Sequence, residues 1–252
     1  MTAERSSDMG RLKNLAAAAA MLCVPCAAVL SAAFGVIGWD AATVIAAVMC
    51  CVPFFLSFEK RAPSARELVL AAVMTAFSAA GRFIFAPIPF FKPVTAIVVL
   101  AAMHLGPQTG FMVGALSAVV SNIYFGQGAW TPFQMFCWGF IGFLAGVLNR
   151  KGVLERAVPL AVYGVFAGAA YSVVMDIWTV LAADGTFSGA RWAAAMISAL
   201  PVTAVYCVSN VIFLLVLRKP VGKRLERIKK KYGVFSAADT EQAQWLYNAD
   251  LP

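Results

Sequence analysis

The sequence is poor in charge and has almost no histidine. Only 13% of its 252 residues are Asp, Glu, Lys or Arg, and His104 is the single histidine. By contrast 62% are hydrophobic, which is more apolar surface than a soluble domain of this size can bury. The few charges are also bunched, so long uncharged runs remain. We therefore expect an all-α integral membrane protein.

Motifs for catalysis and nucleotide hydrolysis are also missing. The sequence contains no Walker A stretch, no HExxH and no GxSxG. Its six cysteines lie inside apolar runs, which indicates packing roles rather than disulfides. Cys23 and Cys26 have CxxC spacing, but neither a histidine nor a second pair accompanies them. We therefore expect no enzyme, no metal site and no cofactor.

Eight apolar runs are candidates for membrane crossings, each of which needs roughly 20 residues of helix. They cover residues 15–34, 41–57, 67–85, 93–105, 108–124, 131–148, 157–182 and 192–217. The fourth run is the exception, because a helix of its length rises only about 20 Å.

The basic residues predict the orientation of these crossings. With the N-terminus in the cytoplasm, the internal segments hold 17 of the 20 lysines and arginines. They are residues 1–14, 58–66, 106–107, 149–156 and everything from 218 onward. This bias predicts a multi-pass protein of the cell membrane with both termini cytoplasmic. It also explains the net charge of +8 without nucleic-acid binding.

Three segments follow from this count. Residues 1–63 form an N-terminal part with two transmembrane helices, 64–217 form a six-helix unit, and 218–252 form a basic cytoplasmic tail. The first run could alternatively be a cleaved signal peptide, but it is long enough to span, so a retained helix is favoured. The tail either lies along anionic membrane lipids or is simply the flank that stops translocation.

Two irregular segments are expected on the external face. "APIPFFKP", residues 86–93, contains three prolines and therefore cannot be helical. In transporters, such interrupted segments often mark the binding site, although an ordinary external loop is the alternative. "FGQGAW", residues 125–130, forms a tight glycine turn between two apolar runs.

Polar side chains within the apolar runs predict a binding cluster. An amide without partners costs several kcal/mol in such a place, so Gln134 must face the bundle interior or a cavity. Asp176 is an intramembrane carboxylate, with Arg82 and Lys92 as candidate partners; a purely structural Asp176–Arg82 ion pair is the alternative. Amides and aromatic rings suit a large, mostly neutral ligand. The expected binding residues are Arg82, Lys92, Asn122, Tyr124, Gln127, Trp130, Gln134, Asp176 and Trp178.

Small residues recur at four-residue spacing and predict close helix packing. One stripe on the run 67–85 contains Ala72, Ala76 and Ala80. Glycines repeat the spacing at Gly110 and Gly114, at Gly142 and Gly146, and at Gly164 and Gly168. Most of these seams are expected inside the bundle, with one stripe free for another membrane protein.

Three stretches carry a resemblance to a known family. They are the helix "ARELVLAAVMTAFSAAGRFIF", the loop "APIPFFKP" and the block "GPQTGFMVGALSAVVSNIYFGQGAWTPFQMFCWGFIGFLAGVL". With them, residues 64–217 resemble the substrate-specific S component of energy-coupling factor (ECF) transporters. The two helices before residue 64 depart from that family's six-helix pattern.

The resemblance implies a function. An S component captures a vitamin or related micronutrient from outside and docks on a transmembrane T component powered by two ATPase subunits. The docking stripe would be Ala72, Ala76 and Ala80, and the loop at 86–93 would cap the substrate. The block is similar to S components for cobalamin-type substrates (corrinoids), while riboflavin or a modified purine would also suit the residues. Two other functions stay open: a self-sufficient secondary carrier that uses Asp176, and a non-transporting membrane scaffold.

Overall fold

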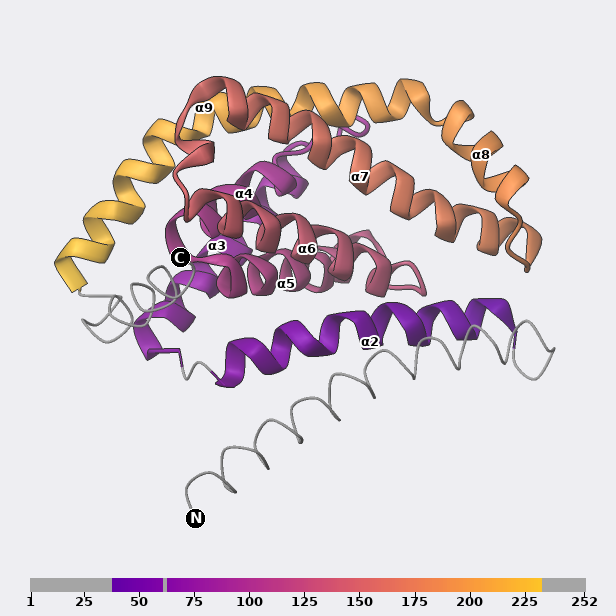
Figure 1. Ribbon diagram of the computed structural model, residues 1–252, viewed down its shortest axis with the longest axis horizontal. Helices are drawn as coiled ribbons and strands as arrows, with labels where there is room; N and C mark the ends of the chain where they lie inside the picture. Colours follow the sequence, from indigo (N-terminus) through magenta and orange to yellow (C-terminus); the bar gives the residue numbers. More distant parts are fainter. Residues whose placement is uncertain (1–37, 61–62, 233–252) are drawn as a thin grey trace, which may run out of the picture.

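The computed structural model describes residues 38–60 and 63–232, and in this part of the chain all regular secondary structure is helical, without a strand (Figure 1). The helices are α2 (Trp39–Lys60), α3 (Ala65–Ile84), α4 (Val94–Leu105), α5 (Pro107–Phe125), α6 (Thr131–Asn149), α7 (Ala157–Asp184), α8 (Gly189–Ser198) and α9 (Leu200–Tyr232), with a short 3-10 turn at Val153–Glu155. The predicted all-α class is confirmed. The first apolar run, 15–34, lies outside the described residues.

Helix boundaries follow local signals in the sequence. The hydroxyl of Ser64 caps α3 by accepting a hydrogen bond from the backbone N–H of Glu67, at 3.3 Å. Pro107 opens α5, where its missing N–H costs nothing. Gly106 and Gly126, with φ of 91° and 96°, flank α5 in backbone conformations that favour glycine. The loop at 86–93 is non-helical, as its prolines predict.

The C-terminal part differs from the sequence prediction in two ways. The run 192–217, expected as one helix, is divided at Ala199 into α8 and α9. In addition, α9 does not end where the charged residues begin but continues to Tyr232, with Pro220 inside it. Figure 1 shows the last part of α9 turning across the end of the bundle.

The short fourth run proves to be the central helix. From Val94 to Ala102 every residue of α4 is buried, because α3, α5, α6 and α9 all pack against it. A helix buried on all sides is apolar all round, which explains its sequence. Among residues 38–60 and 63–232, four other helices are long and apolar enough to cross a bilayer: α3, α6, α7 and the stretch Leu200–Lys229 of α9. Together they support a multi-pass membrane protein.

The glycine seams are internal, as expected. A Cβ on Gly114 would lie 2.4 Å from the backbone carbonyl of Trp138, and one on Gly142 would lie 2.5 Å from the carbonyl oxygen of Gly110. These glycines therefore allow α5 and α6 to pack backbone against backbone. A Cβ on Gly168 of α7 would lie 2.7 Å from the backbone nitrogen of Cys207 on α9.

We predict that Gly114→Ala lowers the free energy of unfolding by about 1–3 kcal/mol, because α5 and α6 must separate to accept the methyl group. Thermal unfolding in detergent measures this loss. Gly189→Ala is the matched control, since no atom lies within 4 Å of a Cβ at that position of α8. Equal melting temperatures for both variants would contradict the close packing of α5 and α6.

Helix α2 corresponds to the expected helix at 41–57 and lies on the outside of α5 and α6 (Figure 1). Its Phe54 ring stacks on Phe111 of α5, with centroids 4.1 Å apart, and contacts Phe143 of α6 edge-on at 5.0 Å. The stripe of Ala72, Ala76 and Ala80 on α3 is exposed, so α2 does not cover it.

Candidate functional site

A cavity of about 380 Å³ opens between the α3–α4 loop and helices α3, α4, α5, α6, α7 and α9. The cavity lies beside the C-terminal end of α3, which the distribution of basic residues predicts to face the outside of the cell. The lining residues are Arg82, Ala86, Pro89, Phe90, Lys92, Val94, Thr95, Phe125, Gln134, Trp138, Gly168, Tyr171, Tyr206 and Asn210.

The loop at 86–93 forms one wall of this cavity. The Lys92 ammonium ties the loop together by donating to the backbone carbonyls of Phe85, Ala86 and Ile88. Partial burial and the nearby Arg82 guanidinium lower the pKa of Lys92. Phe90 has a φ of 60°, a left-handed conformation that is uncommon for an aromatic residue, and its ring contacts Tyr206 at 5.8 Å.

Arg82 enters the cavity from the last turn of α3 and is held by α5. Its guanidinium donates to the Ser121 hydroxyl at 2.5 Å and to Oδ1 of Asn122 at 2.7 Å. Its Cζ also lies 4.5 Å from the centroid of the Phe125 ring. The alternative of an Asp176–Arg82 ion pair is therefore wrong: Arg82 finds closer partners on the neighbouring helix.

A chain of buried amides continues from Arg82. Asn122, fully buried, donates from Nδ2 to Oε1 of Gln134 at 2.8 Å and to the Thr131 hydroxyl at 3.0 Å. Gln134 then donates from Nε2 to the Tyr171 hydroxyl at 3.1 Å. The expectation that Gln134 faces the interior is confirmed, and Asn122 supports the cavity from behind. Four side chains on α3, α5, α6 and α7 thus form one network.

Aromatic rings complete the wall, and one of them, Trp138, lies under the Arg82 guanidinium, whose Cζ is 5.3 Å from the ring centroid. Trp138 and Tyr171 stack with centroids 5.3 Å apart and planes at 13°, and Tyr206 contacts Tyr171 edge-on at 5.2 Å. The sequence prediction missed these three rings, together with Asn210. One signal was available: Trp138 follows Gln134 by four residues, so both lie on the same face of α6.

Other predicted residues lie away from the cavity. Gln127 stabilises the glycine turn at residues 125–130. It donates a hydrogen bond to the carbonyl of Val119 at 2.8 Å and accepts one from the Thr131 hydroxyl at 3.0 Å. Tyr124 is 73% exposed on the outer surface. The rings of Trp130 and Trp178 pack against each other with centroids 6.5 Å apart, and neither residue lines the cavity.

Asp176 also lies outside the cavity lining. It is 8% exposed on α7, and its Oδ2 forms no hydrogen bond within the described part of the chain. Its binding role stays a prediction. The lining itself contains two cations, Arg82 and Lys92, and no carboxylate. This composition favours a ligand with oxygen or nitrogen acceptors attached to a flat ring.

Comparisons with known proteins agree with this architecture. The family model of the S component of ECF-type riboflavin transporters matches residues 62–226. Two curated relatives, both named UPF0397 protein and both from Aliivibrio fischeri (strains MJ11 and ATCC 700601 / ES114), are each 28% identical over 138 residues. Each alignment covers 48% of this chain and 74% of the relative. No solved structure matches the chain at a significant level.

Proposed function

Because the chain belongs to the family of ECF-type riboflavin transporter S components, we propose that its cavity binds a planar vitamin of the size of riboflavin. Membership of this family makes the chain a non-enzymatic, membrane-embedded transporter subunit. It also implies a small-molecule substrate and partners that comprise a T component and ATPase subunits. The identity of the substrate, its binding residues and the direction of capture are the subject of the proposal.

The volume of the cavity favours riboflavin over the corrinoid expected from the sequence. Ligand pockets in proteins measure about 300–1,000 Å³, and the 380 Å³ found here are near the lower limit. A corrin macrocycle with its side groups is several times larger than a three-ring flavin, so the walls would have to separate to admit it. A modified purine has the right size and is the principal competitor.

One observation carries the proposal: a continuous hydrogen-bonded chain from Arg82 to Tyr171 borders a cavity whose lining also includes the rings of Phe90, Phe125, Trp138 and Tyr206. The carbonyl oxygens of a flavin ring would accept from the guanidinium of Arg82, because the three N–H groups of Lys92 already bind the loop carbonyls. The flat ring system would lie against the Trp138 and Tyr171 pair, as aromatic stacking favours. The buried chain fixes each donor before the ligand arrives, which lowers the entropy lost on binding.

The proposed transport cycle begins outside the cell. The basic residues gather at the opposite end of the helices, which supports cytoplasmic termini and an outward-facing cavity in the plasma membrane. The loop at 86–93 would close over the bound vitamin. The chain has no Walker A stretch of its own, so a T component and two ATPase subunits would supply the energy for release.

Two measurements test the bound ligand. Mass spectrometry of the purified protein identifies any small molecule that it retains, and titration of the emptied protein with riboflavin follows the quenching of flavin fluorescence. We expect a flavin to be retained and its fluorescence to be quenched on rebinding. A retained purine or corrinoid would contradict the proposed substrate, whereas absence of any bound molecule and of quenching would contradict the cavity as a binding site.

Substitution of Gln134 tests whether the amide chain matters. We expect Gln134→Leu to weaken riboflavin binding about tenfold, because it leaves Asn122 and Tyr171 without their shared partner. Trp130→Ala is the control, since this ring lies outside the cavity and its removal should change the affinity less than twofold. A larger loss of affinity in Trp130→Ala than in Gln134→Leu would place the ligand at the glycine turn of residues 125–130 instead.

A further inference from the structure

The charged end of α9 is part of the folded bundle. Beyond Leu217, the side chains of Val221, Leu225 and Ile228 pack against the main hydrophobic core, and Leu225 is only 4% exposed. Gly222 lies so close to α4 that a Cβ there would be 3.0 Å from Nε2 of His104. Residues 218–232 thus form an amphipathic segment whose apolar side is already occupied by the rest of the chain.

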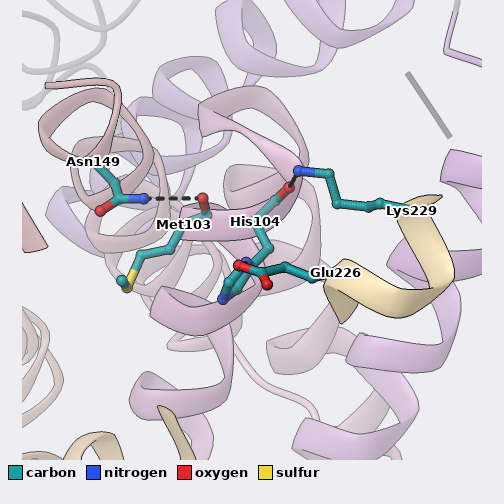
Figure 2. A network of polar contacts seen from close by, with 5 residues as sticks. All are labelled: Met103, His104, Asn149, Glu226 and Lys229. Carbon is teal, nitrogen blue, oxygen red and sulfur yellow. Dashed lines mark hydrogen bonds and ion pairs between the residues drawn. The ribbon is translucent and has the colours of Figure 1, made fainter. Parts of the chain in front are cut away.

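Polar contacts fix this segment across the end of the bundle. The Lys229 ammonium donates to the backbone carbonyl of His104 at 2.8 Å, and a carboxylate oxygen of Glu226 lies 4.0 Å from Nδ1 of His104 (Figure 2). Asn149 donates to the carbonyl of Met103 at 3.1 Å, which ties α6 to the same end of α4. Arg66, at the start of α3, also donates to the carbonyl of Tyr232.

The opposite side of the segment is a cationic face, which we define as Lys219, Lys223, Arg224, Arg227 and Lys231. All five side chains are exposed. Within the described part of the chain, the first four form no ion pair or hydrogen bond through their side chains, and Lys231 contacts only the ring of Tyr232. Lys219, Lys223, Arg227 and Lys231 follow one another at four-residue spacing, and like charges at this spacing destabilise a helix. The packing of Leu225 and Ile228 and the contact of Lys229 hold the helix in spite of this repulsion, and an anionic partner would relieve it.

The position of the cationic face identifies the partner. The apolar part of α9 belongs to a candidate membrane span, and the cations begin directly after Leu217. The packed segment is held against the end of the bundle by its core and polar contacts, so its cations follow directly on the candidate span. Charges this close to a membrane surface attract anionic headgroups. We propose that the cationic face of α9 binds the headgroups of anionic phospholipids. An acidic protein surface is negatively charged as well, but anionic lipid surrounds a membrane-embedded chain whether or not a partner protein is bound.

Native mass spectrometry of the full chain in detergent tests the lipid site. The protein is titrated separately with phosphatidylglycerol and phosphatidylcholine, and the apparent Kd of the first lipid bound is compared. We expect phosphatidylglycerol to bind at least tenfold more tightly. The double variant Lys223→Gln/Arg227→Gln should lose about fivefold in phosphatidylglycerol affinity per side chain removed and keep its phosphatidylcholine affinity.

The matched control removes the same charge from the same end of the molecule. Lys151→Gln/Arg156→Gln changes two exposed basic residues between α6 and α7 and should leave phosphatidylglycerol affinity within twofold. Equal binding of the two lipids, or an equal loss in both double variants, would overturn the proposal. If Lys223→Gln/Arg227→Gln leaves both lipid affinities unchanged but lowers co-purification with the partner subunits, an acidic protein surface is the occupant. The lipid site is then wrong. None of these measurements depends on the vitamin, so the result stands apart from the proposed transport function.

Discussion

The Arg82→Ala variant is expected to bind riboflavin at least a hundredfold more weakly than the unmodified protein. The substitution removes a guanidinium from the cavity wall and leaves Ser121 and Asn122, both fully buried, without their charged donor. Hydrogen bonds to charged groups contribute about 1.5–3 kcal/mol each, and each 1.4 kcal/mol corresponds to a factor of ten in affinity. Fluorescence titration with riboflavin measures the loss.

The controls for Arg82 separate binding from folding. Arg82→Lys keeps the positive charge but cannot reproduce the forked geometry, so it should recover only part of the affinity. Tyr124→Ala removes an exposed aromatic ring from the outer end of α5 and should leave the affinity unchanged. If Arg82→Ala binds riboflavin normally while its melting temperature falls, the guanidinium has a structural role only and the proposed ligand pose is wrong.

The fold was largely predictable because its boundaries depend on local chemistry. Three prolines predicted the loop at 86–93, and Gly106, Pro107 and Gly126 mark the limits of α5. The break between α8 and α9 was missed although Pro201 indicates a helix start. The apolar run continues through this proline without a change in composition, and hydropathy therefore concealed the break.

The continuation of α9 could not be predicted from local sequence. A charged stretch after an apolar helix is typical of a flank that stops translocation. What keeps residues 218–232 helical is the packing of Leu225 and Ile228 on the core and the contact of Lys229 with the end of α4. His104, the partner of Lys229, is 125 residues away in the sequence, so no local pattern indicates this contact.

The cavity was predictable in its polar part and not in its aromatic part. An amide or a guanidinium inside an apolar run must find a partner, and this requirement identified Gln134 and Arg82. An aromatic ring is stable against lipid, against the core or in a cavity, so Tyr171 and Tyr206 carried no distinguishing signal. For the same reason the sequence did not show that Trp130 and Trp178 pack against each other outside the lining of this cavity.

The second large effect concerns assembly with the T component. The structure places Ala72, Ala76 and Ala80 on the exposed side of α3, whereas the parallel stripe of Ala71, Thr75 and Ala79 is buried. The apolar side chains of Val69 and Val73 are also exposed on this helix. This apolar face, with its row of methyl groups and the exposed ring of Phe77 beside Ala76, lets another helix pack closely against α3. We propose it as the docking surface for the T component.

Ala76→Leu is therefore expected to abolish co-purification with the T component and its ATPase subunits while leaving riboflavin binding intact. The larger side chain stands in the centre of the stripe and keeps the backbones apart, so the contacts on both sides of it are lost together. Because Ala76 is exposed, the extra atoms meet no atom of the chain's own core. Pull-down of the tagged variant, co-expressed with its partner subunits, gives the measurement.

Ala204→Leu makes the same change at an exposed alanine of α9 and controls for altered packing against lipid. It should leave the complex intact. A complex that survives Ala76→Leu would mean that the stripe faces lipid alone. A complex lost in both variants would mean that added bulk on the membrane surface prevents assembly wherever it is placed. Loss of the complex in Ala76→Leu but not in Ala204→Leu is the one result that assigns the docking surface to α3. It would also show that α2, which lies against α5 and α6, does not block this surface.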